Sequence, residues 1–416
     1  MGTSSSGVSR RTAVATVGLL VAGRGAAWAQ PGPIKIGMFV PLTGPLAANG
    51  KEMVNGFTLY LEEQGKRLAG REVQLVIEDT EGKPATALTK VRALLESQGV
   101  HMLVGPLSTA EAYAVLSYIE ARKVPTLSPT VAAEDLTQRK RSPYVMRTGW
   151  SAGQPAHPFG KWTYETLKYR KIAIVAQDFA FGHESSAAFQ RTFEEAGGQI
   201  VQRLYAPLGT ADYGPYLAGL KRDVDSVYAA SAGADALRFV RQYADAGLKG
   251  RIPLIGSGNF TDEHVLRSMD DSALGIVTAL HYSAALDTPA NKRFVKAYLA
   301  KFNQVPSYYS EGPYAAGSAL KAALEAVGGE IEDTPRFLTA LHKVNITDAP
   351  RGPIVFDEYG HPIQNIYVRK VERVDGKLQN TVIHTFPRVS QFWTYKPEDY
   401  LKNPVYSRDF PPCKAC

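Results

Sequence analysis

The chain has 416 residues, of which 44% are hydrophobic and 21% charged, and its formal net charge is +7 at pH 7. This length exceeds what one hydrophobic core usually accommodates, so we expect two lobes. Basic residues in 221–251 and 292–301 alternate with acidic and apolar residues. That pattern is typical of solvated helix faces and excludes a nucleic-acid-binding track. Beyond the first thirty residues no segment reaches 18 consecutive apolar residues, so we expect a soluble protein.

The first 29 residues have the order of an export signal. Ser9-Arg10-Arg11 precedes an uncharged stretch from Thr12 to Gly23 and the small-residue run Ala27-Trp28-Ala29, as basic, apolar and cleavage regions do. The arginine pair favours the twin-arginine route, although Ala13 and Val14 are smaller than usual after such a pair, so general secretion stays open. Removing residues 1–29 takes away three arginines and leaves a charge of +4. No cysteine stands directly after the apolar stretch, so we expect an exported protein without a lipid anchor at that point.

Short β-branched runs alternate with amphipathic segments through most of the chain. The run Ile34–Val40 predicts a strand, and 49–66 predicts a helix because Met53, Phe57 and Leu61 keep helical spacing. Further strands are predicted at 73–77, 101–105, 124–127, 144–147, 171–176, 224–230 and 252–255, with helices at 84–98 and 109–122. This alternation favours βαβ units and parallel sheets.

The strand–helix order begins twice. Ile36-Gly-Met-Phe-Val-Pro-Leu42 opens one series and Ile172-Ala-Ile-Val-Ala-Gln-Asp178 opens a second, so we predict two α/β lobes of comparable size. After residue 350 the pattern changes to strands joined by turns, at 353–357, 365–371 and 381–385. These segments predict antiparallel additions to the second lobe.

One pentapeptide matches a catalytic motif. Gly149-Trp150-Ser151-Ala152-Gly153 fits the G-x-S-x-G nucleophile elbow of α/β-hydrolases, whose serine leads straight into a helix. Pro155 and Pro158 predict that a helix starts only near residue 158. An inter-lobe crossover is therefore our main interpretation of this segment, and a serine hydrolase that uses Ser151 is the minor alternative.

The sequence indicates no cofactor or metal. Gly256-Ser257-Gly258 follows a predicted strand but has Thr261 in place of the third glycine of a dinucleotide fingerprint. His281 and His361 are interpreted as surface or hydrogen-bonded residues. Cys413 and Cys416 lie in a Pro-rich terminus, where a local disulfide or a loose tail is expected instead of a redox motif or a zinc site.

Two loops could hold an anion. Gly105-Pro-Leu-Ser108-Thr109-Ala-Glu111 runs from a strand into a helix, and Ser108 with Glu111 forms a capping-box pattern. Ser108 either only caps this helix or belongs to a helix N-terminus that binds a carboxylate. Ser128-Pro-Thr130-Val131 has the same place one unit later. Ligands of open α/β sheets gather at the carboxyl ends of the strands, so both loops are candidate ligand contacts.

The order of several segments resembles the leucine/isoleucine/valine-binding family of periplasmic solute receptors, which serve ABC importers. The resemblance covers about 34–390 and is carried by 36–45, 78–82, 104–106, 124–129, 147–148, 181–182 and 351–353. It implies the type I periplasmic binding protein fold, which is an α/β architecture of two Rossmann-like lobes joined by three crossovers. The implied divisions are crossovers near 147–152, 280–284 and 353–358, lobe 1 at 34–148 and 283–354, lobe 2 at 149–282 and 355–390, and a C-terminal tail at 391–416.

The resemblance also implies a set of ligand contacts. The first-lobe loop falls on Leu107, Ser108 and Thr109, with Thr109 as the carboxylate anchor. The other implied positions are Asn49, Thr130, Val131, Phe181, Ala232, Gly258 and Tyr309. Amino-acid receptors of this type usually carry a threonine where Ala132 stands. They carry an acid where Gly258 stands, and that acid pairs with the substrate ammonium; Asp178 or Asp262 could replace it.

Other segments are similar to a branch of the family in which some receptors bind aromatic or other hydrophobic carboxylates. They are 70–79, 349–353 and 364–369. Phe179, Phe181, Tyr282 and Tyr309 could form an apolar, stacking-competent cleft, or they could simply pack the core. The first expected ligand is therefore a hydrophobic or aromatic carboxylate, followed by a branched-chain amino acid.

These features predict a monomeric, non-enzymatic periplasmic receptor that captures a small carboxylate between closing lobes. Its expected partners are an ABC permease and ATPase in the inner membrane, with no nucleic acid and no cofactor. A periplasmic ligand sensor on the same fold is the alternative.

Overall fold

The computed structural model describes residues 1–7 and 32–416, and residues 33–416 form one compact unit. The essential parts of the expected export signal fall on residues 8–29, which lie outside the described part of the chain. Within the described ranges, no helix combines the length and the apolar character that crossing a bilayer requires.

The first lobe is built on a six-stranded sheet in the order β2-β3-β1-β4-β5-β6. All its strand pairs are parallel except β2 with β3. The strands are β1 (Ile34–Val40), β2 (Arg67–Leu68), β3 (Arg71–Asp79), β4 (Met102–Val104), β5 (Thr126–Ser128) and β6 (Val145–Arg147). Their helices are α1 (Ala47–Glu63), α2 (Pro84–Glu96) and α3 (Thr109–Arg122).

Helices cover both faces of this sheet, so its strands are apolar on both sides. Met38 of β1 packs in the core layer shared with α1 and α10 (Tyr308–Ala326), whereas the neighbouring Phe39 packs in the layer shared with α2 and α3. The helix α11 (Thr334–His342) and the short strands β12 (Asn345–Ile346) and β13 (Ile354–Phe356) complete the first of these layers.

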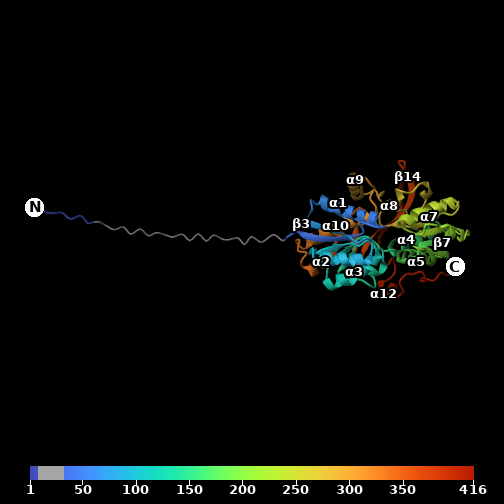
Figure 1. Ribbon diagram of the computed structural model, residues 1–416, viewed down its shortest axis with the longest axis horizontal. Helices are drawn as coiled ribbons and strands as arrows, with labels where there is room; N and C mark the ends of the chain where they lie inside the picture. Colours follow the sequence, from blue (N-terminus) through green and yellow to red (C-terminus); the bar gives the residue numbers. More distant parts are fainter. Residues whose placement is uncertain (8–31) are drawn as a thin grey trace. The chain divides into compact units, whose positions relative to one another are not determined.

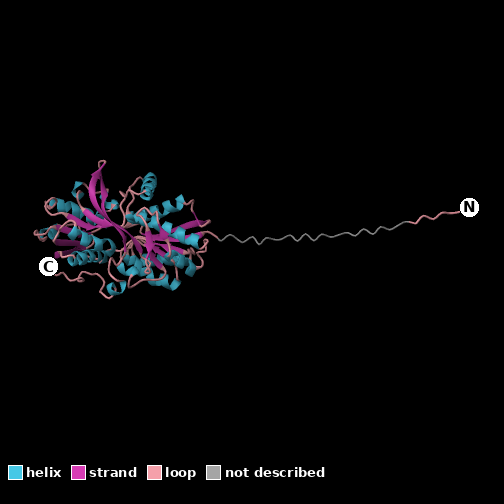
Figure 2. Ribbon diagram, turned by 180° about the vertical axis from the view of Figure 1, so that it is seen from behind, coloured by secondary structure: helices cyan, strands magenta, loops and turns pink. Residues whose placement is uncertain are grey.

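The second lobe is built on a sheet that contains the order β14-β11-β10-β9-β7-β8, with β15 paired to β14. Its strands are β7 (Lys171–Gln177), β8 (Gln199–Ala206), β9 (Ser226–Ala230), β10 (Leu254–Ser257), β11 (Val277–Leu280), β14 (Pro362–Val374) and β15 (Lys377–Val389). Its helices are α4 (Gly153–Glu165), α5 (Ala180–Glu195), α6 (Gly214–Ala218), α7 (Gly233–Asp245) and α8 (Glu263–Leu266). Figure 2 shows the two groups of strands, each with helices around it.

The chain passes between the lobes after β6, after β11 and between β13 and β14, which confirms the predicted α/β fold of two lobes joined by three crossovers. After the second crossover, α9 (Pro289–Phe302) leads into α10. In Figure 1 the blue α1 lies beside α10, and α4, α5, α7 and β7 lie together in green to yellow. The strand β14 belongs to both lobes, since Ile363 pairs with Val355 of β13 while Val368 pairs with Ala279 of β11.

One sequence-based prediction about the elements is wrong. The helix α4 starts at Gly153, five residues before the expected start, and contains Pro155 and Pro158. The first four N–H groups of a helix have no intrahelical acceptor, so Pro155 costs no hydrogen bond there. Pro158 does cost one, and the burial of Phe159 in the second-lobe core offsets it. For the C-terminus, the expected local disulfide is confirmed, since Cys413 and Cys416 are joined. The other alternative, a loose tail, does not apply to Phe392, Tyr400 and Tyr406, which are buried.

Candidate functional site

The first-lobe candidate loop follows β4 and opens α3. Ser108 is confirmed as a helix cap: its backbone N–H donates to Glu111 Oε2 at 3.0 Å, and Glu111 N–H donates to Ser108 Oγ at 3.3 Å. The Ser108 hydroxyl also donates to Glu111 Oε2 at 2.6 Å, so its proton is already used. Leu107 is buried, and Thr109 is the half-buried first residue of the helix. Ser108 is therefore engaged as a cap, which leaves Thr109 as the candidate ligand contact at this helix N-terminus.

The second first-lobe loop follows β5. Thr130 Oγ1 donates to the carbonyl of Pro106 at 3.2 Å, which ties this loop to the preceding one. Val131 is fully buried among the core residues behind the sheet, whereas Ala132 packs against the aromatic cluster described below. Asn49 is buried on α1. The structure thus brings the loops of Leu107 and Thr130 together and turns the side chain of Val131 away from them.

In the second lobe the candidates lie at the starts of helices. Phe179 precedes α5 and is 36% exposed, while Phe181 in the first turn of α5 is buried. Ala232 precedes α7, and its N–H donates to Gln177 Oε1 at 3.2 Å. Tyr282 is buried and stacks edge-on against Phe294 at 6.4 Å between ring centroids.

Gly258, which follows β10, has no room for a side chain. A Cβ atom placed there would lie 2.4 Å from Cβ of Leu280 and 2.7 Å from the carbonyl oxygen of Ala279. The position at which related receptors are expected to carry an acid is therefore closed by β11, so a carboxylate cannot reach the cleft from this point.

An aromatic cluster joins the two lobes. Its members are Trp150 of the first crossover, Phe181 of α5, His281 of the second crossover, and Tyr308 and Tyr309 of α10. Trp150 stacks on His281 at 5.8 Å between centroids and meets Tyr308 edge-on at 5.8 Å and Phe181 edge-on at 6.2 Å. The ring centroids of Tyr308 and Tyr309 lie 4.0 Å apart. The cluster draws on both lobes and two crossovers, so motion of the lobes must rearrange it.

Several polar atoms in and beside this cluster are buried without a hydrogen-bond partner among the described residues: Trp150 Nε1, both ring nitrogens of His281, Asn259 Oδ1 and Asp262 Oδ1. The side-chain N–H of Asn259 donates to the hydroxyl of Tyr308 at 2.7 Å, so within the described residues only the amide oxygen Oδ1 of Asn259 lacks a partner. Buried polar groups are normally paired, so unpaired ones gathered in one place indicate where a ligand or water completes the structure.

The sequence did not point to Trp150, Tyr308 or Asn259 as ligand contacts, and its interpretation of His281 is wrong. His281 is fully buried, and neither of its ring nitrogens has a hydrogen-bond partner in the part of the chain that the structure describes. His361 is also buried, and its Nδ1 lies 3.1 Å from the hydroxyl of Thr137. The sequence signal that could have found them is their position, because Trp150 and His281 fall inside two of the three predicted crossovers.

Burial keeps the ionisable members of the cluster neutral. The pKa of His281 is held well below its usual range, first by burial and then by the charges of Arg351 and Arg369. Burial also raises the pKa of Tyr308 well above its usual range. Neutral His281 presents one donor and one acceptor, and Trp150 presents one donor. These groups suit a ligand that has both an aromatic face and hydrogen-bonding substituents.

Of the two acids that could replace the missing carboxylate, only Asp262 lies beside the cluster. It is buried, and its charge contributes to the raised pKa values of Tyr308 and Tyr309. Burial and the neighbouring Glu263 raise the pKa of Asp262 well above its usual range, against the opposing charge of Arg369. Asp178 instead bonds to His183 at 2.8 Å and to Arg408 at 3.0 Å, outside the cluster.

A cluster of ionisable residues around the buried Glu52 joins the lobes next to the aromatic residues. Glu52 of α1 lies 2.9 Å from Nδ1 of His264 in α8 and also bonds to Arg267 and Ser307. Burial would raise the pKa of Glu52, but the hydrogen bond and charges of His264 and Arg267 lower it overall. We call Glu52, His264 and Arg267 the clasp, since an acid of one lobe is held there by bases of the other.

Ser151 does not have the environment of a catalytic nucleophile. It is fully buried, and among the described residues its hydroxyl has no hydrogen-bond partner. A nucleophile elbow instead exposes its serine and places a base within hydrogen-bonding reach.

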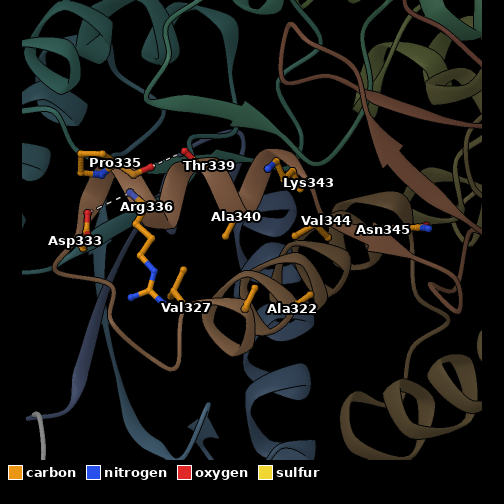
Figure 3. Close-up of a pocket in the computed structure, with 11 residues that line it drawn as sticks. Ala322, Val327, Asp333, Pro335, Arg336, Thr339, Ala340, Lys343, Val344 and Asn345 are labelled. Carbon is orange, nitrogen blue, oxygen red and sulfur yellow. Dashed lines mark hydrogen bonds between the residues drawn. The ribbon is translucent and has the colours of Figure 1, made fainter.

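A groove of about 800 Å³ lies elsewhere, between α10 and α11 (Figure 3). Arg336 and Thr339 of α11 and the following Lys343 line it together with Ala322 and Val327. Its walls come from the first lobe alone, and it contains none of the candidate residues. It is therefore separate from the aromatic cluster.

The chain is similar to periplasmic binding proteins and to substrate-binding proteins of ABC transporters. A family model described as periplasmic binding protein matches residues 33–377. The Leu/Ile/Val-binding protein homolog 6 of Brucella melitensis is 31% identical over 383 residues, which cover 90% of this chain and 97% of that protein. An ABC transporter substrate-binding protein from Sphaerobacter thermophilus is 38% identical, with a TM-score of 0.83 over 86% of this chain and 99% of the other.

A second solved structure has a comparable TM-score and a lower sequence identity. It is a solute binding protein of an ABC transporter from Rhodopseudomonas palustris BisB5 in complex with 3,4-dihydroxy benzoic acid. It is 33% identical to this chain, with a TM-score of 0.82, and the likeness covers 86% of this chain and 98% of the other.

Proposed function

Because this chain belongs to the periplasmic binding protein family, we propose that it is the extracytoplasmic receptor of an ABC importer and binds a small carboxylate between its lobes. The observation that carries the proposal is the set of unpaired buried polar atoms of Trp150, His281 and Asn259 within a cluster built from both lobes. In this role the protein is exported to the periplasm, acts as a monomer, and delivers its ligand to a permease and ATPase. It catalyses no reaction.

An aromatic carboxylate is the ligand class that we favour. The rings of Trp150, Phe181 and Tyr308 supply stacking faces, and the closed space at Gly258 removes the acid that would pair with an ammonium group. The Rhodopseudomonas palustris relative with 3,4-dihydroxy benzoic acid supports the same class. Thr109 at the start of α3 would hold the carboxylate, since free N–H groups at a helix N-terminus favour negative charge.

A branched-chain amino acid is the second candidate. Asp262 is buried beside Tyr308 and Tyr309 with Oδ1 unpaired, and an ammonium group there would restore its ionised form. The relative from Brucella melitensis, named as a Leu/Ile/Val-binding protein homolog, supports this candidate.

Thermal unfolding of the purified chain against 3,4-dihydroxybenzoate, benzoate, isoleucine and valine tests the proposal. A ligand at a hundred times its dissociation constant should stabilise the protein by about 2.7 kcal/mol. Thr109→Ala should remove most of this gain, whereas Thr89→Ala on α2, whose hydroxyl only bonds back to Ala85, should leave it intact. Stabilisation by isoleucine alone, lost in Asp262→Asn, would replace the aromatic class by the amino-acid class. Turnover of a bound ester by the wild type but not by Ser151→Ala would overturn the receptor role.

A further inference from the structure

The chain after β15 is firmly attached to the second lobe. The hydroxyl of Tyr406 lies 3.0 Å from Nε2 of His157 in α4. Further along, Arg203 of β8 donates to the carbonyl of Pro411 at 2.9 Å, and Gln190 of α5 donates to that of Pro412 at 3.0 Å. The Cys413–Cys416 disulfide follows directly. Figure 1 shows this segment passing through α12 (Pro397–Tyr400) and ending near α5.

The same segment also bonds to the first lobe. The hydroxyl of Tyr400 donates to Glu134 Oε2 at 3.0 Å, and Arg139 donates to the carbonyl of Asn403 at 2.6 Å. Thr137 Oγ1 donates to Gln391 Oε1 at 3.1 Å, and Gln391 Nε2 donates back to the carbonyl of Thr137 at 3.3 Å. All three first-lobe partners lie in the loop 134–139 between β5 and β6.

These contacts are buried. Phe392, Tyr400 and Tyr406 are between 2% and 5% exposed. Tyr395, Tyr400 and Tyr406 surround His157 with ring centroids 5.8 to 5.9 Å from its own. Water therefore cannot easily replace the bonds of Tyr400, and breaking them without other change would leave polar groups unpaired.

We propose that residues 391–412 act as a strap, a fourth connection between the lobes that restrains their opening by holding the loop 134–139 against the second lobe. The three crossovers alone leave the lobes free to hinge, as in other proteins of two domains joined by short segments. The strap adds bonds that lie outside the crossovers and whose two ends belong to different lobes. Opening beyond the reach of these side chains must first break the bonds of Tyr400, Arg139 and Gln391.

The test compares two variants of the ligand-free full chain. In the first, Tyr400→Phe with Arg139→Gln removes two bonds to the first lobe but keeps the Tyr400 ring in its packing. In the control, Arg408→Gln removes a strap contact to Asp178, which belongs to the second lobe. Small-angle X-ray scattering reports lobe opening through the radius of gyration. Hydrogen exchange of the peptide 130–140 reports whether the loop 134–139 stays docked. If the double variant does not fold, Tyr400→Phe alone takes its place in both measurements.

The proposal expects amide exchange in 130–140 to rise at least about fivefold in the double variant, as the loss of one hydrogen bond would give. It also expects a larger radius of gyration, with neither change in the control. Faster exchange with an unchanged radius would overturn it, because the segment would then be only a local attachment. Unchanged exchange and radius would overturn it as well.

Discussion

At Gly258 the backbone runs so close to β11 that there is no room for a side chain. An added Cβ would meet both Leu280 and Ala279 at less than 3 Å, and the carbonyl of Gly258 accepts a 2.7 Å bond from Arg369. The Cβ of Leu280 and the carbonyl oxygen of Ala279 are not the free end of a flexible side chain. The strand β11 would therefore have to move to make room for a side chain at position 258. The absence of an acid here is thus built into the packing of the second lobe.

Gly258→Ala should therefore destabilise the protein by about 1–3 kcal/mol, the usual cost of forcing an extra carbon into a packed site. Urea unfolding monitored by circular dichroism measures this change. Gly219→Ala is the matched control, because its added Cβ would lie 3.5 Å or more from the nearest atoms. An equal effect of the two substitutions would contradict the steric explanation.

Glu134 is a second residue whose surroundings determine its chemistry. Burial raises the pKa of its carboxyl to about 7, and the charge of Asp135 adds to the rise while the Tyr400 hydroxyl and Arg139 oppose it. Its N–H donates to Glu184 Oε2 at 3.1 Å, and burial with the charge of Glu134 raises the pKa of Glu184 as well. The two carboxyls come from different lobes and are both favoured in their protonated forms.

The pH dependence follows from this raised pKa. The native state binds the proton of Glu134 more tightly than the unfolded chain does, so its contribution is present below the ordinary pKa of 4.5 and is lost as pH rises to about 7. The loss is at most about 3 kcal/mol. Glu134→Gln should flatten the fall in unfolding free energy between pH 5 and pH 8 but not abolish it, since Glu184 remains. Chemical unfolding at both pH values measures the slope, and an identical slope in the variant would refute the assignment.

Among the elements, α1 and α8 are linked by the clasp. Glu52 is 3% exposed and the Arg267 side chain is 31% exposed, so the carboxylate end of this ion pair is shielded from water. By contrast, the pair of Lys301 with Glu62 on α9 and α1 is 36% exposed on both sides and lies within the first lobe. Screening by water makes such surface pairs weak, whereas loss of one partner of a buried pair leaves an uncompensated charge.

A double-mutant cycle of Glu52→Gln and Arg267→Gln should thus give a coupling energy of about 1–3 kcal/mol in thermal unfolding. The matched cycle of Glu62→Gln and Lys301→Gln should give about 0.5 kcal/mol or less. Addition of 0.5 M salt should reduce the second value more than the first. Equal couplings in the two cycles would show that the clasp contributes no more than a surface pair.

The elements also show where reasoning from sequence succeeds. The short apolar run Ile34–Val40 predicts β1, and the capping box at Ser108 predicts the start of α3; both are found. The start of α4 could not be predicted, since a proline-containing segment becomes helical only when the second-lobe core covers it. Propensity is a weak guide where burial decides.

For the whole molecule, the resemblance to the receptor family and the two-lobed fold are confirmed. The ligand-contact positions and the lobe boundaries remain predictions. Trp150, His281 and Tyr308 are separated by up to 158 residues in the sequence. They meet because two crossovers and α10 converge. Such a meeting of distant segments has no local periodicity, which is why sequence spacing alone could not reveal it.

The shared strand β14 has a mechanical consequence. One backbone ribbon is hydrogen-bonded at Ile363 to the first lobe and at Val368 to the second, so swinging the lobes twists a continuous ladder without parting it. The segment from Ile363 to Val368 therefore couples the two lobes directly, and a change in their relative orientation has to be taken up within these few residues.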